Sequence, residues 1–455
     1  MRAWFAGDYE TCLVLCDLVE RRRSALVVDV RLLRARVLLR LGRTNDALAV
    51  LEQLAAVDVL DASITVRMLQ GTVLVRLGKI DQGLAILDAA QADAAAGDAH
   101  PTVRSEIALY RALAYYGLRD LAAAETALLA VMPDADVVHA QALSYQAWIA
   151  TARGEYPAAI ELFVASLRRL DACRRCDRPL EANCLQALSV FAVERLDRSL
   201  WQFVDARAQR LNWDGSGLAE ARFWITMASC YMEELEGRNA AAVRAARLAE
   251  ELAPSDAYRV QARLRRAAIT RLVGELATQH DHVTSAREMF ARLSPETLTG
   301  DERNVALTLA EELAHVGAVD DARSAFAVYR ANPVSALLSS KGDRRVQAYE
   351  RLVEAQIAEA AGDRVAAHHG YRDAFQGFRS TGYRRRALIA ALRLAEIAEQ
   401  PYLYDYVASE MREFSEASWF RRHVMHRRGI LEAGMSRAAA DTDANCDPPR
   451  LEVVR

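Results

Sequence analysis

The chain has 455 residues, of which 52% are hydrophobic and 7% aromatic, and its formal net charge at pH 7 is −3. This near-neutral charge excludes electrostatic binding of nucleic acid as the role of the chain as a whole. The longest run without a charged residue, 137–152, is too short and too polar to span a bilayer. Residues 1–7 lack the apolar segment of a signal peptide, so we expect a soluble cytoplasmic protein. Nearly all basic residues are Arg rather than Lys, which indicates a GC-rich, bacterial genome.

A short pattern recurs in chain order from the first residues onward. A turn residue is followed five positions later by a small residue and four later by an aromatic residue or Leu. The well-formed copies are Gly42-Ala47-Leu51, Gly78-Gly83-Leu87, Gly154-Ala159-Phe163, Gly237-Ala242-Ala246, Gly317-Ala322-Phe326 and Gly362-Ala367-Tyr371. Weaker copies are expected at Arg119-Ala124-Leu128, Glu194-Ser199-Phe203 and Asp281-Ala286-Phe290. From Gly42 to Gly362, eight steps cover 320 residues, or 40 per step. A fixed period of about 20 to 50 residues predicts a solenoid of supersecondary units.

Each unit is expected to be a pair of antiparallel helices. In the copy around Gly154, the preceding residues place Ala147 on one helical stripe, and Pro157 fits the first turn of the next helix. Small residues at Ala147 and Ala159 allow the two helices to approach closely, and Phe163 fills the space toward the next unit. The same pattern begins at Gly7-Asp8-Tyr9, after a first helix of at most six residues. The stack is therefore expected to begin on half a unit, with an apolar face that needs a cap or a partner.

This pattern resembles the tetratricopeptide repeat (TPR) family, on the evidence of Gly154-Glu155-Tyr156, Ala159 and Phe163 and of Gly237, Ala242, Ala249 and Pro254. The period of 40 departs from the family's period of about 34 residues and implies longer helices or loops. The sequence predicts an all-α protein, an α-solenoid of about nine to ten TPR-like helical hairpins over residues 1–435. Sub-blocks 1–215 and 216–435 are an expected subdivision, and the polar residues 436–455 are expected to be a disordered tail.

The resemblance implies that the first helix of each hairpin lines a concave groove for a protein or peptide partner. Counting back from each turn gives groove positions that include Glu234, Leu307, Glu311, Leu352 and Gln356. The candidate partner-binding residues are Arg36, Arg40, Met68, Arg76, Tyr116, Ser144, Trp148, Trp224, Met227, Tyr231, Arg271 and Glu275. The large side chains among them suit either interface anchors or packing between neighbouring hairpins, and both interpretations stay open. The Lys-then-Asn pairing of chaperone-binding TPRs is absent from these positions, which argues against a chaperone adaptor.

No motif in the sequence indicates catalysis, so we expect neither an enzyme nor a cofactor. Cys173 and Cys176, with Cys184 nearby, could bind zinc only with a fourth ligand from elsewhere, and thiols in a loop are the simpler interpretation. The histidine pairs His280/His282, His368/His369 and His423/His426 lie near no nucleophile motif, and we expect them to be solvated or capping. The basic cluster around Arg421 and Arg428 is either a solvated helix face or a surface for an acidic partner.

The C-terminal part suggests one specific context. The helix opened by Gly382-Tyr383-Arg384-Arg385-Arg386, a further helix over 403–414 and the polar linker 436–447 together resemble the helical-repeat region of LuxR-type bacterial transcription regulators, the group that includes maltose-regulator-like proteins. Residues 449–455 resemble the opening of that family's helix-turn-helix, and the rest of that DNA-binding domain is absent from this sequence.

Two functional hypotheses follow from the sequence. The first is a signal-receiving module of a LuxR-type regulator that does not itself bind DNA. The second is a free-standing scaffold that binds a peptide or helix in its concave groove. Both leave open a small-molecule effector and self-association.

Overall fold

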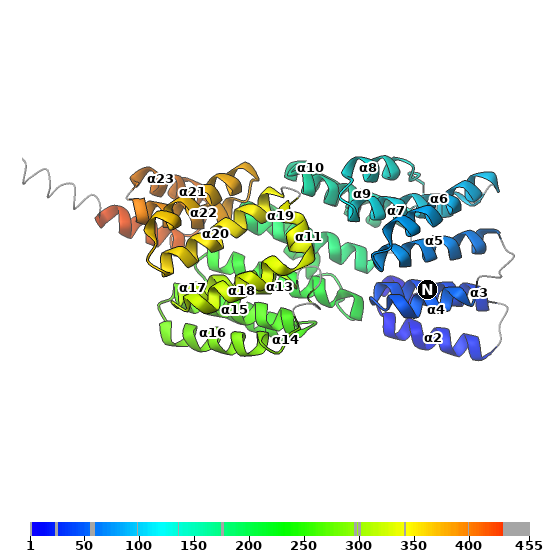
Figure 1. Ribbon diagram of the computed structural model, residues 1–455, viewed down its shortest axis with the longest axis horizontal. Helices are drawn as coiled ribbons and strands as arrows, with labels where there is room; N and C mark the ends of the chain where they lie inside the picture. The colour runs from blue at the N-terminus through cyan, green and yellow to red at the C-terminus, as the bar shows by residue number, and fades with distance from the viewer. Residues whose placement is uncertain are drawn as a thin grey trace, which may run out of the picture. The chain divides into compact units, whose positions relative to one another are not determined.

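The structure is a computed structural model, and it describes residues 2–22, 26–54, 60–97, 99–134, 136–173, 177–294, 298, 302–340, 343–398 and 400–430. Within these ranges the secondary structure is helical, with no strand (Figure 1). None of the helices in this part of the chain is long and apolar enough to cross a bilayer.

The helices follow one another in pairs joined by short turns. Their bounds are α1 (Arg2–Ala6), α2 (Tyr9–Arg21), α3 (Val27–Arg40), α4 (Thr44–Glu52), α5 (Leu60–Arg76), α6 (Ile80–Ala96), α7 (Pro101–Gly117), α8 (Leu121–Leu129), α9 (Asp136–Arg153), α10 (Tyr156–Ala172), α11 (Arg178–Arg195), α12 (Arg198–Ala208), η1 (Ser216–Leu218), α13 (Ala219–Leu235), α14 (Asn239–Leu252), α15 (Asp256–Leu272), α16 (Leu276–Phe290), α17 (Asn304–His315), α18 (Val319–Ala331), α19 (Pro333–Ser340), α20 (Arg344–Ala360), α21 (Arg364–Ser380), α22 (Arg384–Ala398) and α23 (Pro401–Glu410). Residues 419–430 are also helical. This succession of helical hairpins confirms the predicted all-α solenoid.

The recurring turn residues mark the points where the chain reverses between paired helices. Gly154, for example, has a φ of 82°, in the left-handed region that glycine adopts without steric cost. The small residue five positions on, Ala159, is fully buried, and so is Phe163 four positions later. The sequence pattern therefore encodes one turn and two buried positions of each second helix.

For two of the weaker copies, the turn predicted from the sequence is at the wrong position. The α11–α12 turn is at Leu196, which has a φ of 58°, and the buried side chains after it are Leu200 and Val204. Phe203, expected inside, is 40% exposed. The α15–α16 turn is at Gly274, seven positions before the expected Asp281. The third weak copy, at Arg119, has its turn where the sequence predicts it, with a φ of 61°.

The chain divides into two compact units, Met1–Ala192 with Asp197–Ile225, and Val193–Leu196 with Thr226–Arg455. The division after Ile225 lies beyond the 215/216 subdivision expected from the sequence, and residues 436–455 lie outside the described part. The two units are described separately below.

In the first unit, the earliest hairpin meets the last residues of the same unit. The amide N of Gly217 donates to the carbonyl O of Gly7 at 3.0 Å. Gly217 lies so close to the ring of Tyr9 that a Cβ there would overlap it. Segments about 210 residues apart in sequence are therefore packed together, and the unit closes on itself.

The second unit closes in the same manner. The backbone of Ala417 approaches Gly237, at the α13–α14 turn, so closely that a Cβ on Gly237 would overlap the Ala417 carbonyl group. The Arg385 guanidinium of α22 donates to Glu194 at 2.9 Å, although the two residues are 191 positions apart. The last helices of this unit therefore return to its first residues and enclose the concave side.

Candidate functional site

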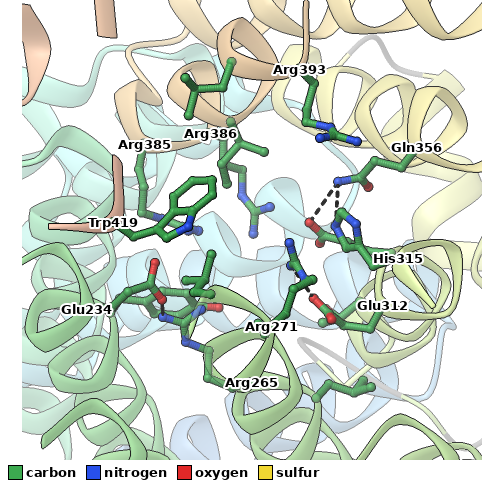
Figure 2. A pocket seen from close by; sticks show the side chains of 18 of the residues that line it. Glu234, Arg265, Arg271, Glu312, His315, Gln356, Arg385, Arg386, Arg393 and Trp419 are labelled. Atoms are coloured by element: carbon green, nitrogen blue, oxygen red, sulfur yellow. Dashed lines mark hydrogen bonds and ion pairs between the residues drawn. The ribbon is translucent and has the colours of Figure 1, made fainter. Parts of the chain in front are cut away.

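A cavity with a volume of about 350 Å³ lies on the concave side of the second unit. It is lined by the first helices of successive hairpins, α13, α15, α17, α20 and α22, and by helical residues 419–430 (Figure 2). A volume of this size is within the range of sites that hold small ligands or a few side chains.

The lining is dense in charged side chains. Five arginines and four glutamates line it, namely Arg265, Arg271, Arg385, Arg386, Arg393, Glu234, Glu311, Glu312 and Glu396. Burying charges is costly unless they are paired, so the pairing of each charge determines what the cavity can still bind.

Most of these charges are paired inside the unit. Arg265 donates to Glu234, and both side chains are about 5% exposed. Arg271 donates to Glu312 at 3.1 Å, and Glu312 is also buried (Figure 2). On the opposite wall, Arg393 donates to Glu396 at 2.6 Å. These pairs fix the positions of the guanidinium groups around the cavity.

Aromatic rings hold three of the arginines in place. The Tyr231 ring has the Arg265 guanidinium 3.7 Å from its centroid and the Arg385 guanidinium 4.4 Å from it. The Arg386 guanidinium lies 3.8 Å from the centroid of Tyr349. Such contacts stabilise a desolvated cation by about 2 kcal/mol and limit its rotation.

Burial displaces the pKa values of several titratable groups in the cavity, among them His315 and Glu312. Burial lowers the pKa of His315 well below its ordinary value, and the nearby Arg271 and Arg393 cations lower it further. His315 is therefore neutral at pH 7. Burial also raises the pKa of Glu312, although its ion pair with Arg271 opposes the shift.

Helical residues 419–430 form one wall of the cavity. Trp419 and His423 stack with ring centroids 4.7 Å apart, and both line the cavity. His423 Nε2 is 2.7 Å from Glu396 Oε1, which connects this helix to α22. Farther along, Arg428 pairs with Asp405 at 3.3 Å. Part of the basic cluster thus makes ion pairs within the second unit.

The sequence-based groove positions of the second unit fall partly in this cavity. Of the candidate partner-binding residues, Tyr231 and Arg271 line the cavity. Glu234, Glu311 and Gln356, which the count back from each turn also gave as groove positions, line it too. Met227 is fully buried in the core, and Glu275 is exposed at the start of α16, away from the lining.

A smaller cavity of about 50 Å³ lies in the first unit. It brings together three of the predicted residues, Arg40, Ser144 and Trp148. Trp148 is half-buried and packs edge-on against Phe163 at 5.3 Å, while the Ser144 hydroxyl donates to the Gln141 carbonyl at 2.7 Å.

The other predicted residues of the first unit lie outside this small cavity. Arg36 forms a two-pronged ion pair with Glu106, with a shortest distance of 2.6 Å. Arg76 donates to the Leu39 carbonyl, and the Tyr116 ring has Arg119 5.5 Å from its centroid. Met68 is fully buried, and Trp224 is half-buried with its ring edge-on to Phe223 at 5.3 Å. The two methionines therefore present no surface to a partner.

The cysteine and histidine clusters give no further site in the described part. Cys12, Cys16, Cys173, Cys184 and Cys230 are free thiols, and Cys176 lies outside the described residues. No group of three His, Cys, Asp or Glu side chains among the described residues could hold a metal ion.

Sequence reasoning missed the wall formed by α22 and residues 419–430. The run Arg384-Arg385-Arg386 was a usable signal, because two adjacent arginines on a buried helix require buried carboxylates or a ligand. No pattern in the sequence indicated that Trp419 returns to the start of the second unit.

Similarity to one solved structure supports the fold, and two others match with lower TM-scores. The apo form of RapI is similar over 78% of this chain and 98% of its own, with a TM-score of 0.52 and 10% identity. A Rap protein complexed with Competence and Sporulation Factor matches over 84% and 99%, with a TM-score of 0.40 and 12% identity. A chain of the APC/C hetero-tetramer Cut9–Hcn1 matches over 91% and 89%, with a TM-score of 0.34 and 14% identity.

At these identities the similarity is one of fold, and the fold is a TPR-like helical-repeat solenoid. No protein-family model matches the chain. No curated protein matches it either.

Proposed function

We propose that the chain is a non-catalytic binding module that holds a peptide segment of a partner protein in the concave cavity of its second unit. The supporting observation is that the cavity is lined by the first helices of successive hairpins and contains buried, oriented polar groups. A repeat protein presents its concave face as an extended binding surface.

The composition of the cavity favours a polar ligand over an apolar helix. Gln356 is 3% exposed, and its amide N donates to Glu311 at 3.2 Å, while its Oε1 has no hydrogen-bond partner within the described residues. The buried Glu312 likewise has one carboxylate oxygen without a partner there. Buried polar atoms are normally satisfied, so these atoms suit the amides and charged groups of a peptide.

A bulky substitution inside the cavity tests the proposal. Ala268 lines the cavity, and Ala268→Trp introduces a large side chain there without replacing any ion-paired residue. The matched control is Ala240→Trp on the exposed side of α14. Peptides selected from a displayed random library on the wild-type chain should lose at least tenfold in affinity for the Ala268→Trp variant and none for the control.

The proposal is wrong if no peptide is enriched, or if the enriched peptides bind the Ala268→Trp variant as well as the wild type. Circular dichroism melting of both variants checks that they are folded. The regulator hypothesis rests on the helices within 382–414, on the linker 436–447 and on residues 449–455, and the last two segments lie outside the described residues, so it stays a prediction.

A further inference from the structure

We propose that Arg386 anchors a carboxylate of the bound peptide. This inference rests on the proposed function and names the chemical group that the cavity recognises.

Arg386 differs from the other arginines of the cavity in its hydrogen bonding. Arg271 donates to Glu312 at 3.1 Å and Arg385 to Glu194 at 2.9 Å. Within the described part of the chain, the closest approach of Arg386 to a carboxylate is 3.5 Å, from its Nε to Glu194. That carboxylate already accepts from Arg385. The terminal nitrogens of Arg386 therefore have no acceptor among the described residues.

The guanidinium of Arg386 is nevertheless held in a defined position. It lies 3.8 Å from the centroid of Tyr349, its side chain is 17% exposed, and it points into the middle of the cavity (Figure 2). A planar guanidinium with free terminal nitrogens donates two parallel hydrogen bonds to a carboxylate. Since the cation is already positioned and mostly desolvated, binding such a ligand orders little additional structure.

The surrounding charges select a singly charged anion. Glu311 is adjacent, because its carboxylate accepts from the Tyr349 hydroxyl at 3.2 Å. Three further glutamates line the same cavity. Together with the five arginines, these four glutamates leave the lining with an excess of one positive charge. A single carboxylate neutralises that excess, whereas a phosphate group with a charge of about −1.5 to −2 exceeds it. The cavity therefore favours a carboxylate over a phosphate.

The carboxylate of a peptide comes either from its C-terminus or from an Asp or Glu side chain. Three pools of N-acetylated hexapeptides with otherwise uncharged, randomised residues separate these sources. The first pool has a free C-terminus, the second has a C-terminal amide and one internal Glu, and the third has a C-terminal amide and Gln at that position. Retention of each pool by the full chain is measured by equilibrium dialysis and mass spectrometry.

The variants are Arg386→Gln, Arg386→Lys and the matched control Arg323→Gln. Arg323 lies on the exposed face of α18, paired with Asp320 at 3.2 Å. The wild type and the control should retain at least one of the first two pools, which carry a carboxylate, tenfold or more above the third pool, which carries none. Arg386→Gln should abolish this preference and retain all pools alike, and Arg386→Lys should keep part of it.

Equal retention of all three pools by the wild type would overturn the carboxylate inference and leave peptide binding intact. Persistence of the preference in a folded Arg386→Gln variant would overturn the role of Arg386. If the Arg386→Gln variant does not fold, Arg386→Lys is measured instead. An undiminished preference of Arg386→Lys for a carboxylate pool would overturn two-pronged recognition of the carboxylate by Arg386. Retention of no pool would contradict the proposed function itself.

Discussion

The closure of the second unit depends on one buried carboxylate, and Glu194→Gln tests it. Glu194 is 8% exposed, accepts from Arg385 at 2.9 Å and lies 3.5 Å from Arg386. The substitution leaves two buried guanidinium groups without their counter-ion. Removing one partner of a buried pair costs about 3–5 kcal/mol, and we expect the lower end, about 3 kcal/mol, because both arginines keep their tyrosine contacts.

The expected effect is local to the closure. If α22 opens locally, a loss of about 3 kcal/mol in the stability of its closed state corresponds to roughly 100-fold faster amide hydrogen exchange in this helix. If the whole second unit melts together, its melting temperature should fall by about 6–12 °C. Hydrogen exchange read by mass spectrometry measures the first effect, and calorimetry measures the second.

The matched control is Glu354→Gln in the same unit. Glu354 also pairs with two arginines, Arg330 at 3.4 Å and Arg351 at 2.9 Å, but these side chains are 60% and 59% exposed. Exposed pairs contribute less than about 1 kcal/mol. Equal changes in α22 exchange for the two variants would refute the reasoning that Glu194 closes the unit.

Three further predictions concern the second unit. Gly237→Ala should destabilise residues 415–420 by more than about 2 kcal/mol, because its Cβ overlaps the Ala417 carbonyl group. The control Gly362→Ala has open space around its Cβ, so it should cost only about 1 kcal/mol, from the left-handed backbone conformation. Hydrogen exchange compares the two variants. Because the pKa of His315 is depressed in the folded state, the unfolded chain binds a proton at His315 at a higher pH than the folded chain does. The contribution of His315 to the free energy of unfolding is therefore full above about pH 6.5 and is lost as pH falls below that value. His315→Gln should flatten this part of the stability profile in urea titrations. Tyr231→Leu removes the ring between two guanidinium groups and should cost about 2 kcal/mol, whereas Tyr231→Phe keeps the ring face and should cost under about 1 kcal/mol in the same titrations.

The local geometry of the repeats was readable from the sequence where glycine marks the turn. Gly154 and its equivalents adopt a left-handed φ that other residues rarely adopt, so a glycine at these positions indicates a turn. Leu196 takes the same conformation without glycine, and nothing in its identity indicates a turn. In α16, the position five residues after the turn at Gly274 is Gln279, which is buried although it is polar. Because this position is not a small residue, the sequence pattern places the turn seven residues too late, at Asp281.

The site was predictable only as far as it follows the repeat. Counting along first helices reached Tyr231 and Glu311, because each lies six residues before the turn glycine of its own hairpin, Gly237 or Gly317. Arg271 also lines the cavity, but it lies three residues before its turn at Gly274. Arg386 and Trp419 reach the cavity because the second unit curves until its last helices meet its first residues. That curvature is the sum of small rotations between hairpins, which no local pattern encodes.

The closure and the proposed carboxylate site share the same pair of arginines, and this sharing makes their energetics interdependent. In the wild type, Glu194 supplies one negative charge to both Arg385 and Arg386. A ligand carboxylate on Arg386 adds a second one and should slow hydrogen exchange in α22 as the ligand concentration rises above its Kd. In Glu194→Gln the two cations have lost their internal anion, so a carboxylate peptide should stabilise α22 more in this variant than in the wild type. Equal stabilisation of both by the same peptide, at matched saturation, would show that the ligand carboxylate binds elsewhere.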